Sequence, residues 1–219
     1  MKPYFEPNSV LTRRRVLSVV AVAVAIVLLA YGITRALQRI EGIATINAPQ
    51  RKAANAPYIT SPNEIIAQMI ELGQISSQDL VFDLGCGDGR IVIQAAASRR
   101  CRGVGFDIDP ELVKLATANA AENGVSDLVR FEQRDIFTID LSEANVIVMY
   151  LVPWMVNKLV PQFEKCRPGT RIVSHEFALN DFVYNDMITL EHELDTHTIY
   201  LYETPLQPIR DSVKEAIQP

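Results

Sequence analysis

Residues 80–90, LVFDLGCGDGR, decide the fold of this chain. An apolar run ends in an acid, Asp83, three glycines follow at alternate positions, and an apolar helical pattern then begins. This order predicts a buried parallel strand, a tight turn and the start of a helix. Alternate glycines allow positive φ angles and let backbone N–H groups approach a ligand that a Cβ would hold away. Since ligands of open α/β sheets bind at the carboxyl ends of strands, Asp83 is placed to accept hydrogen bonds from a cationic amine.

Two more acids follow predicted strands. The strand pattern at 102–106 ends at Asp107, about twenty residues after the turn, where an acid can hold both hydroxyls of a ribose. The pattern at 129–132 is followed by Asp135, which is placed to reach the edge of an adenine. This spacing favours an adenosine-containing ligand, whereas the glycine turn alone could also be a structural corner.

Three motifs carry a resemblance to a known family. Residues 83–90 (DLGCGDGR), 107–110 (DIDP) and 133–137 (QRDIF) resemble the first three motifs of class I S-adenosylmethionine-dependent methyltransferases. The resemblance covers about residues 57–204 and implies an α/β fold, a Rossmann-like seven-stranded sheet with helices on both faces, and S-adenosyl-L-methionine as cofactor. The positions matching its cofactor-binding motifs are Asp83, Gly85, Cys86, Gly87, Asp107, Ile108, Asp135 and Ile136.

A narrower resemblance concerns the substrate. Residues 57–62 (PYITSP), 150–153 (YLVP) and 173–177 (VSHEF) look like a subgroup that contains the mitochondrial lysine methyltransferase of the ATP synthase c-subunit and its bacterial relatives. It implies a protein-lysine acceptor. If residues 57–62 fold back as a lid, the hydroxyl of Thr60 can reach the methionine carboxylate; a rigid linker made by the two prolines is the alternative.

The candidate catalytic residues lie at the ends of the fourth and fifth predicted strands (145–151 and 171–177): Tyr150, His175 and Glu176. A lysine acceptor must lose its proton and be aligned with the methyl group, so a carboxylate, aromatic ring or carbonyl is needed beside it. Tyr150 as a core aromatic and His175 as a structural histidine are the alternatives. The Asn/Asp-Pro-Pro-Tyr motif of many DNA and glutamine methyltransferases is absent, which argues against an amide or exocyclic-base acceptor.

Histidine and cysteine spacing predicts no metal site. The three histidines, His175, His192 and His197, are too scattered for a metal ligand set, and the three cysteines have no C-x-x-C spacing, so neither a zinc site nor a disulfide framework is expected. Cys86 is expected to serve as a small side chain in the glycine turn, without a nucleophilic role.

The chain from Pro57 onward is acidic, with 13 lysines and arginines against 24 aspartates and glutamates. Nucleic-acid binding usually requires a basic face, so no nucleic-acid partner is expected, and a lysine-bearing protein fits better.

An uncharged run, residues 16–33, predicts a membrane anchor because eighteen helical residues span about 27 Å. A buried core helix and a cleaved signal peptide are the alternatives. The expected organisation is a tail (1–15), a transmembrane anchor (16–34), a linker (35–56), the methyltransferase domain (57–204) and a C-terminal tail (205–219). This predicts a single-pass membrane protein. The arginines at 13–15 favour a cytoplasmic amino terminus, but the cofactor requirement outweighs them and places the domain on the cytoplasmic or matrix side.

Together these patterns predict a membrane-anchored methyltransferase that modifies a protein lysine, on a substrate that could itself be a membrane protein. A small-molecule, lipid or quinone methyltransferase and a non-catalytic cofactor-binding module are the alternatives. Locally, Ser61 is expected to cap a helix that ends near Gly73, and residues 187–194 and 197–203 are expected to form a closing antiparallel pair.

Overall fold

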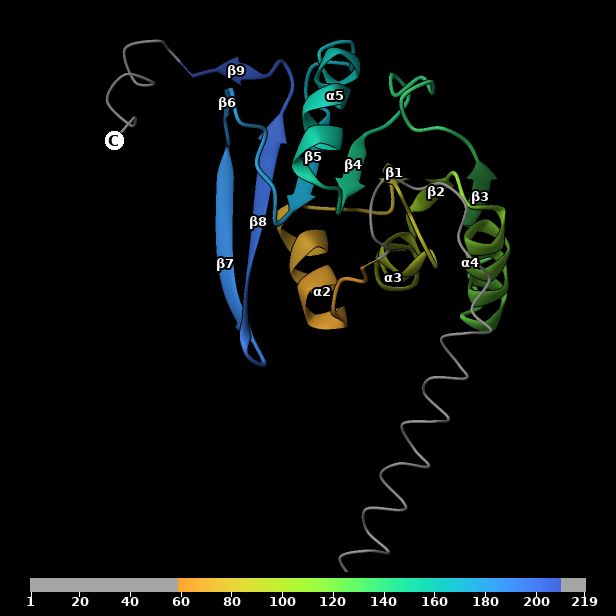
Figure 1. Cartoon of the computed structure of the whole chain (residues 1–219). Helices are drawn as coiled ribbons and strands as arrows, with labels where there is room; N and C mark the ends of the chain where they lie inside the picture. The colour runs from red at the N-terminus through yellow and green to blue at the C-terminus, as the bar shows by residue number, and fades with distance from the viewer. Residues whose placement is uncertain (1–58, 210–219) are drawn as a thin grey trace, which may run out of the picture. The chain divides into compact units, whose positions relative to one another are not determined.

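The computed structural model describes residues 59–209, and its centre is one mixed sheet of seven strands (Figure 1). Helices and strands alternate along the first two thirds of this part, as the sequence predicts. In chain order the elements are α2 (Asn63–Leu72), β1 (Leu80–Leu84), α3 (Arg90–Arg99), β2 (Arg102–Asp107), α4 (Pro110–Glu122), β3 (Val129–Gln133), β4 (Val146–Met149), α5 (Pro153–Phe163), β5 (Arg171–His175), β6 (Phe182–Val183), β7 (Asp186–His192), β8 (Asp195–Glu203) and β9 (Gln207–Pro208).

The strand order is β3-β2-β1-β4-β5-β8-β7. The first five strands are parallel, whereas β8 runs antiparallel to β5 and β7 runs antiparallel to β8. The chain moves outward from β1 to β2 and β3, then returns to place β4 on the other side of β1. Ligands of open α/β sheets bind at such a switch point, beyond the carboxyl ends of the strands. The seven-stranded prediction is confirmed, including the closing antiparallel pair.

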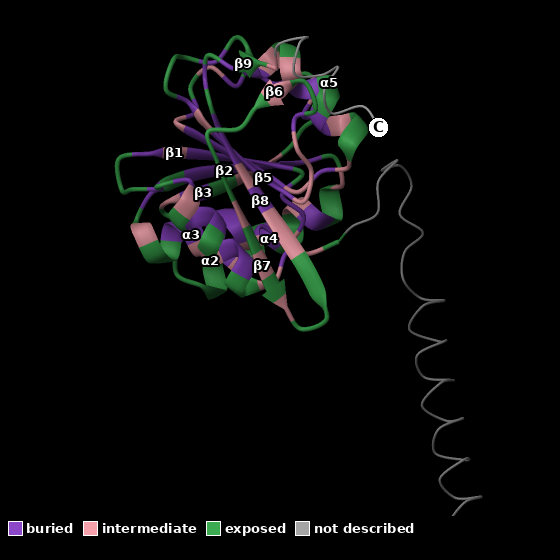
Figure 2. Ribbon diagram, turned by 90° about the vertical axis from the view of Figure 1, so that its left-hand side faces the viewer, coloured by how far each residue is buried: buried purple, intermediate pink, exposed green. Residues whose placement is uncertain are grey.

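Helices cover both faces of the sheet. On one face the buried side chains of α2, α3 and α4 pack against β1, β3 and β4 in a single cluster. On the other face α5 contributes Val156, Leu159 and Phe163, which pack with Phe82, Leu84 and Phe106. Buried residues therefore run through the sheet, while the far end of the β7–β8 hairpin is exposed (Figure 2).

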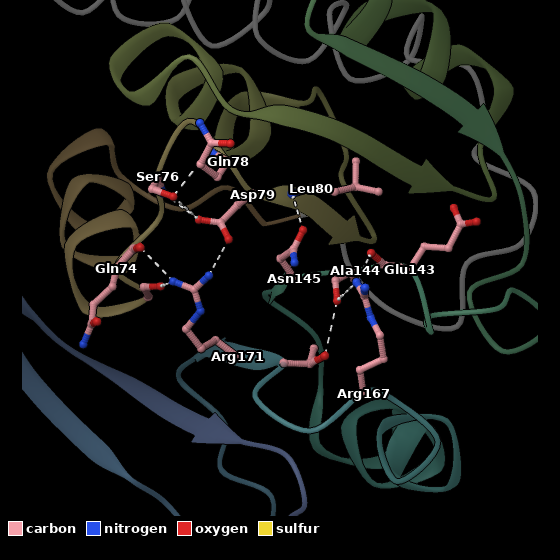
Figure 3. A network of polar contacts seen from close by, with 12 residues as sticks. Gln74, Ser76, Gln78, Asp79, Leu80, Glu143, Ala144, Asn145, Arg167 and Arg171 are labelled. Carbon is pink, nitrogen blue, oxygen red and sulfur yellow. Dashed lines mark hydrogen bonds and ion pairs between the residues drawn. The ribbon is translucent and has the colours of Figure 1, made fainter.

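A polar network ties together the amino-terminal ends of the central strands (Figure 3). Arg171, at the start of β5, donates to the carbonyl oxygens of Gly73 and Gln74 and pairs with Asp79 at 2.5 Å. Asp79 is buried and also accepts from the backbone N–H and hydroxyl of Ser76. This end of the sheet lies opposite the carboxyl ends, so the network fixes the strands without entering the candidate site.

One local prediction is corrected. Ser61 does not cap α2: the N-cap is Pro62, and the Ser61 hydroxyl bonds to His175 instead. Of the expected C-terminal tail (205–219), the described residues include Leu206, which is buried in the core, and Gln207–Pro208, which pairs with β6.

The predicted localisation is also corrected. Within residues 59–209 no helix is both long and apolar enough to cross a membrane. The run at 16–34, on which the predicted anchor rests, lies outside the described residues. The prediction of a single-pass membrane protein is thus contradicted for the part of the chain that the structure describes.

Candidate functional site

The glycine turn after β1 has the geometry that its sequence predicts. Gly85, Gly87 and Gly89 all have positive φ angles, of 74°, 56° and 80°. The backbone N–H groups of Gly85 and Cys86 donate to the carbonyl oxygen of Phe106, which fastens the turn to β2. A Cβ on Gly85 would lie 2.8 Å from Leu151 Cδ2, the end of a flexible side chain, so the positive φ is the main reason for glycine here.

Asp83 is the most unusual group at this edge. Its side chain is 1% exposed, and neither carboxyl oxygen has a hydrogen-bond partner among the described residues. Burial raises the pKa of Asp83 to about 8; Asp107 and Asp88 add to the rise, and the backbone N–H of Val92, which is outside hydrogen-bond geometry, opposes it. A buried carboxyl without a partner is costly, so a hydrogen-bond donor that arrives with a ligand would be held strongly.

Asp107 lies at the carboxyl end of β2, as predicted, and its carboxylate organises the turn. Oδ2 accepts from the N–H of Gly87 at 2.9 Å, and Oδ1 accepts from the N–H of Asp109 at 3.0 Å. Each carboxylate oxygen has a second lone pair, so a pair of ribose hydroxyls can still be accepted. The next residue, Ile108, is 47% exposed and therefore offers an apolar surface beside this carboxylate.

The remaining predicted cofactor positions surround the same edge. Asp135 is exposed, and its Oδ1 accepts from the N–H of Phe137, which shapes the loop after β3. Ile136 is buried, and its carbonyl accepts from Gln162 of α5. Cys86 is buried, and burial raises the pKa of its thiol, which agrees with a small side chain that is no nucleophile.

The segment before α2 reaches this edge as well. Thr60 is half-buried and precedes Ser61, whose hydroxyl lies 2.8 Å from His175 Nδ1. Arg90 donates to the Ser61 carbonyl and forms an ion pair with Asp88 of the glycine turn. These bonds hold the segment against the glycine turn and the end of β5. A contact between Thr60 and a ligand requires the segment to lie at this edge of the sheet.

The three candidate catalytic residues do come together. In the sheet register Leu84 is opposite Met149, and Met149 is opposite Ser174, so Tyr150 and His175 each follow at the same level as Gly85. The rings of Tyr150 and His175 have centroids 4.2 Å apart. Glu176 lies one residue beyond β5, and its φ of 68° is unusual for a residue other than glycine.

His197 joins them, although its sequence position gives no sign of it. Its Nδ1 lies 2.6 Å from Glu176 Oε1 and 3.1 Å from His175 Nε2. The contact arises because β8 pairs antiparallel with β5, which brings residues 22 apart into one cluster. Sequence spacing missed this contact: residues 197–203 were expected only as one strand of the closing antiparallel pair, with His197 an ordinary strand residue.

Burial sets the protonation states of His175 and Tyr150. Desolvation, with a smaller contribution from His197, lowers the pKa of His175 to about 4, so its ring is neutral near pH 7. Burial raises the pKa of Tyr150, and Glu176 and Asp195 add to the rise, so its hydroxyl keeps its proton.

These residues fit S-adenosyl-L-methionine. The donor carries an ammonium group, ribose hydroxyls and an adenine. Asp83 offers a buried carboxyl without a partner, and Asp107 offers a carboxylate at the end of the next strand. The glycine turn leaves its backbone open between them.

The comparisons with known proteins agree with one another on the reaction class. Residues 83–186 match the family described as ANTKMT methyltransferase domain. A protein-lysine N-methyltransferase of Saccharolobus islandicus is 39% identical over 150 residues, which cover 68% of this chain and 93% of that protein. The lysine N-methyltransferase of the ATP synthase c-subunit from Caenorhabditis elegans is 27% identical over 153 residues, which cover 67% of this chain and 78% of that protein.

A solved structure adds the bound product of the donor. The crystal structure of an RNA methyltransferase from Salinibacter ruber in complex with S-adenosyl-L-homocysteine is 43% identical. It covers 70% of this chain and 97% of its own, with a TM-score of 0.64. This chain therefore belongs to the S-adenosylmethionine-dependent methyltransferases, and it is an enzyme that uses S-adenosyl-L-methionine.

Proposed function

We propose that this enzyme transfers the methyl group of S-adenosyl-L-methionine to the side-chain amine of a lysine in a protein. The observation that carries the proposal is the 39% identity, over nearly the whole of the relative, to a protein named as a protein-lysine N-methyltransferase. Relatives at lower identity carry lysine N-methyltransferase names too, for the ATP synthase c-subunit and for the adenine nucleotide translocase.

The chemistry of the candidate site supports an amine acceptor. When bound, S-adenosyl-L-methionine supplies an electrophilic methyl group on a sulfonium. Tyr150 and Glu176 lie at the ends of β4 and β5, one and two strands from Asp83. Oε1 of Glu176 is engaged by both histidines, so Oε2 is the oxygen that can accept a hydrogen bond from an acceptor amine. The half-buried ring of Tyr150 provides a wall that aligns the amine and excludes water.

For the cofactor, we propose that Asp83 and Asp107 hold the ammonium and the ribose, and that residues 85–87 provide the open backbone between them. Ile108, Asp135 and Ile136 are proposed to surround the adenine, and Thr60 to contact the methionine carboxylate. The position of each residue at a strand end or in the segment before α2 supports its proposed role.

An RNA acceptor is the second candidate, because the Salinibacter ruber protein bears the name of an RNA methyltransferase. The excess of acids from Pro57 onward, 24 against 13 basic residues, disfavours it. RNA binding gains most of its affinity from basic side chains on phosphates. The charge balance therefore favours the protein substrate.

The deciding experiment offers all acceptors at once. Purified full-length protein and S-adenosyl-L-methionine with a radiolabelled methyl group are added to lysate from cells of the source organism that lack the gene. Protein, RNA and lipid fractions are then counted separately, and labelled protein is hydrolysed for amino-acid analysis. Methyl-lysine in a discrete protein band supports the proposal. Label confined to RNA or to lipid contradicts it and establishes that acceptor class instead.

A matched pair of variants makes the result specific. Glu176→Gln keeps the size of the side chain and should lower the methyl-lysine yield, because an amide no longer offers a charged acceptor. Glu193→Gln, on the exposed β7–β8 turn, should leave the yield unchanged. Equal yields from the two variants would remove Glu176 from the proposed site.

A further inference from the structure

Three side chains at the candidate site carry donor atoms of the kind that bind metal ions. Three donor atoms converge where β5 ends beside β8: His175 Nε2, His197 Nδ1 and Glu176 Oε1. They lie 3.1 Å (His175 to His197), 2.6 Å (His197 to Glu176) and 3.3 Å (His175 to Glu176) from one another. We propose that His175, Glu176 and His197 form a binding site for one divalent transition-metal ion of the Zn²⁺ class.

The donor set and its dimensions suit such an ion. Two imidazoles and one carboxylate are a common protein ligand set for zinc, with metal–ligand bonds of about 2.0–2.2 Å. Ligand atoms around a tetrahedral ion at those lengths lie about 3.3 Å apart. Two of the three separations already come close to this value. The third is a hydrogen bond between His197 and Glu176, which must widen by about 0.7 Å when an ion replaces the shared proton.

The scaffold holds these donors without needing a large movement. His175 is opposite Ile199 in the antiparallel pair of β5 and β8. The N–H of Glu176 donates to the Thr198 carbonyl at 2.7 Å. This bond fixes Glu176 at its positive φ, a conformation that costs free energy outside glycine and that clusters at functional sites. The strand pair therefore sets the direction of all three side chains.

A second layer of contacts completes the arrangement. The ring nitrogen of His175 that faces away from the cluster, Nδ1, bonds to the Ser61 hydroxyl at 2.8 Å. Metal-binding histidines commonly use their other ring nitrogen in this way, which fixes the tautomer that leaves the ligating nitrogen free. Ser61 is itself buried, so this bond is shielded from water.

The cluster is open on one side and carries no competing cation. His175 is fully buried, whereas the side chains of His197 and Glu176 are 13% and 23% exposed, so a fourth ligand such as water can enter. In the described part of the chain the carboxylate of Glu176 is paired with the two imidazoles and with no lysine or arginine. A hydrogen-bonded cluster that never takes a metal is the alternative that the experiment must separate.

Occupancy would change methyl transfer, a consequence that rests on the proposed function. An ion held by Glu176 neutralises the carboxylate that is proposed to accept a hydrogen bond from the acceptor amine. Zn²⁺ is therefore expected to inhibit lysine methylation at the concentrations that fill the site.

Binding is tested without any methyl transfer. Metal-free full-length protein is titrated with Zn²⁺ by calorimetry, and with Co²⁺ by absorption spectroscopy. We expect one ion per chain. We also expect a Co²⁺ spectrum without a thiolate charge-transfer band, which excludes Cys86, Cys101 and Cys166 as ligands. His197→Ala and Glu176→Gln should each weaken binding at least tenfold.

The matched control is His192→Ala. His192 is in the same hairpin, with its ring centroid 6.1 Å from that of His197, but it is not one of the three converging donors. Its replacement should leave the affinity within twofold, and circular dichroism should show that all three variants are folded. Failure to bind Zn²⁺, binding that survives both ligand variants, or a thiolate band would each overturn the proposal. None of these results bears on whether the enzyme methylates lysine.

Discussion

At the scale of single residues, the burial of Asp83 has a measurable cost. In the unfolded chain this carboxyl titrates near its ordinary pKa of 3.8, whereas burial raises its pKa in the folded chain to about 8. Between these values the folded chain keeps a proton that the unfolded chain has released. Below pH 4 the carboxyl is protonated in both states and its titration costs the folded state nothing, whereas the penalty to the folded state grows as the pH rises toward 8.

Asp83→Asn should consequently separate stability from cofactor binding. In cofactor-free protein we expect a higher free energy of unfolding, by on the order of a few kcal/mol at pH 8 and by clearly less at pH 5.5. Affinity for S-adenosyl-L-methionine should fall at least tenfold. Urea denaturation at the two pH values and calorimetric titration measure both. An equal gain at both pH values would contradict the raised pKa.

Tyr150 allows a cleaner test of the acceptor side. Tyr150→Phe keeps the ring that packs 4.2 Å from the His175 ring, between centroids, and removes only the hydroxyl. If the hydroxyl aligns the acceptor amine, kcat should fall about 10- to 100-fold while the Kd for S-adenosyl-L-methionine stays within twofold. Steady-state kinetics with the protein substrate gives the first quantity and calorimetry the second. An unchanged kcat would leave Tyr150 as a packing residue.

At the scale of elements, the junction between the glycine turn and α3 tolerates no side chain. Gly89 has φ +80°, and a Cβ there would lie 2.7 Å from the Phe131 ring and 2.9 Å from Ala116 Cβ. Gly89→Ala should lower the free energy of unfolding by roughly 2–4 kcal/mol, from strain and overpacking together.

The control for Gly89 is Gly124→Ala. Gly124 has φ +66°, but a Cβ there meets nothing within 4 Å. Only the strain of the positive φ remains, so the loss should be about 1 kcal/mol. Denaturant unfolding of the two variants separates crowding from backbone conformation, and equal losses would contradict the crowding.

The polar network at the amino-terminal ends of the strands should affect stability alone. Asp79→Ala leaves Arg171 without its carboxylate and should cost roughly 2–4 kcal/mol, because both side chains are largely removed from water. Asp127→Ala breaks the exposed pair with Arg100 and should cost less than about 0.5 kcal/mol. In both variants the affinity of folded protein for the cofactor should be unchanged, which calorimetry checks. A weakened affinity in Asp79→Ala would show that the two ends of the sheet are coupled.

At the scale of the whole molecule, the cofactor should stabilise the fold it binds. S-adenosyl-L-homocysteine at about 100 times its Kd should add about 2.7 kcal/mol to the free energy of unfolding, since it binds the folded chain only. For a chain of this size the thermal midpoint should then rise by roughly 5–10 °C. NAD⁺ at the same concentration should give no shift, because the G-x-G-x-G turn lacks the spacing of the dinucleotide fingerprint. Thermal unfolding followed by circular dichroism measures both.

The sequence by itself determined the order of strands and helices and the class of ligand. The stretch 80–90 encodes a strand, a turn and a helix start in adjacent residues, and the acids after the next two strands lie at predictable ends of a parallel sheet. The methyltransferase motifs can be recognised in the sequence because each consists of a strand end and the turn that directly follows it.

Tertiary structure alone decided that Ser61 and His197 join the site. Ser61 looks like a helix cap, yet its hydroxyl bonds to His175, 114 residues away. His197 joins Glu176 only because β8 enters the sheet antiparallel to β5 in one particular register. The strand pattern predicts the β7–β8 pair, but it does not identify β5 as the other neighbour of β8, and packing in three dimensions selects that neighbour. The cofactor half of the site could therefore be predicted from local motifs, whereas the histidine–glutamate cluster became visible only in the folded chain.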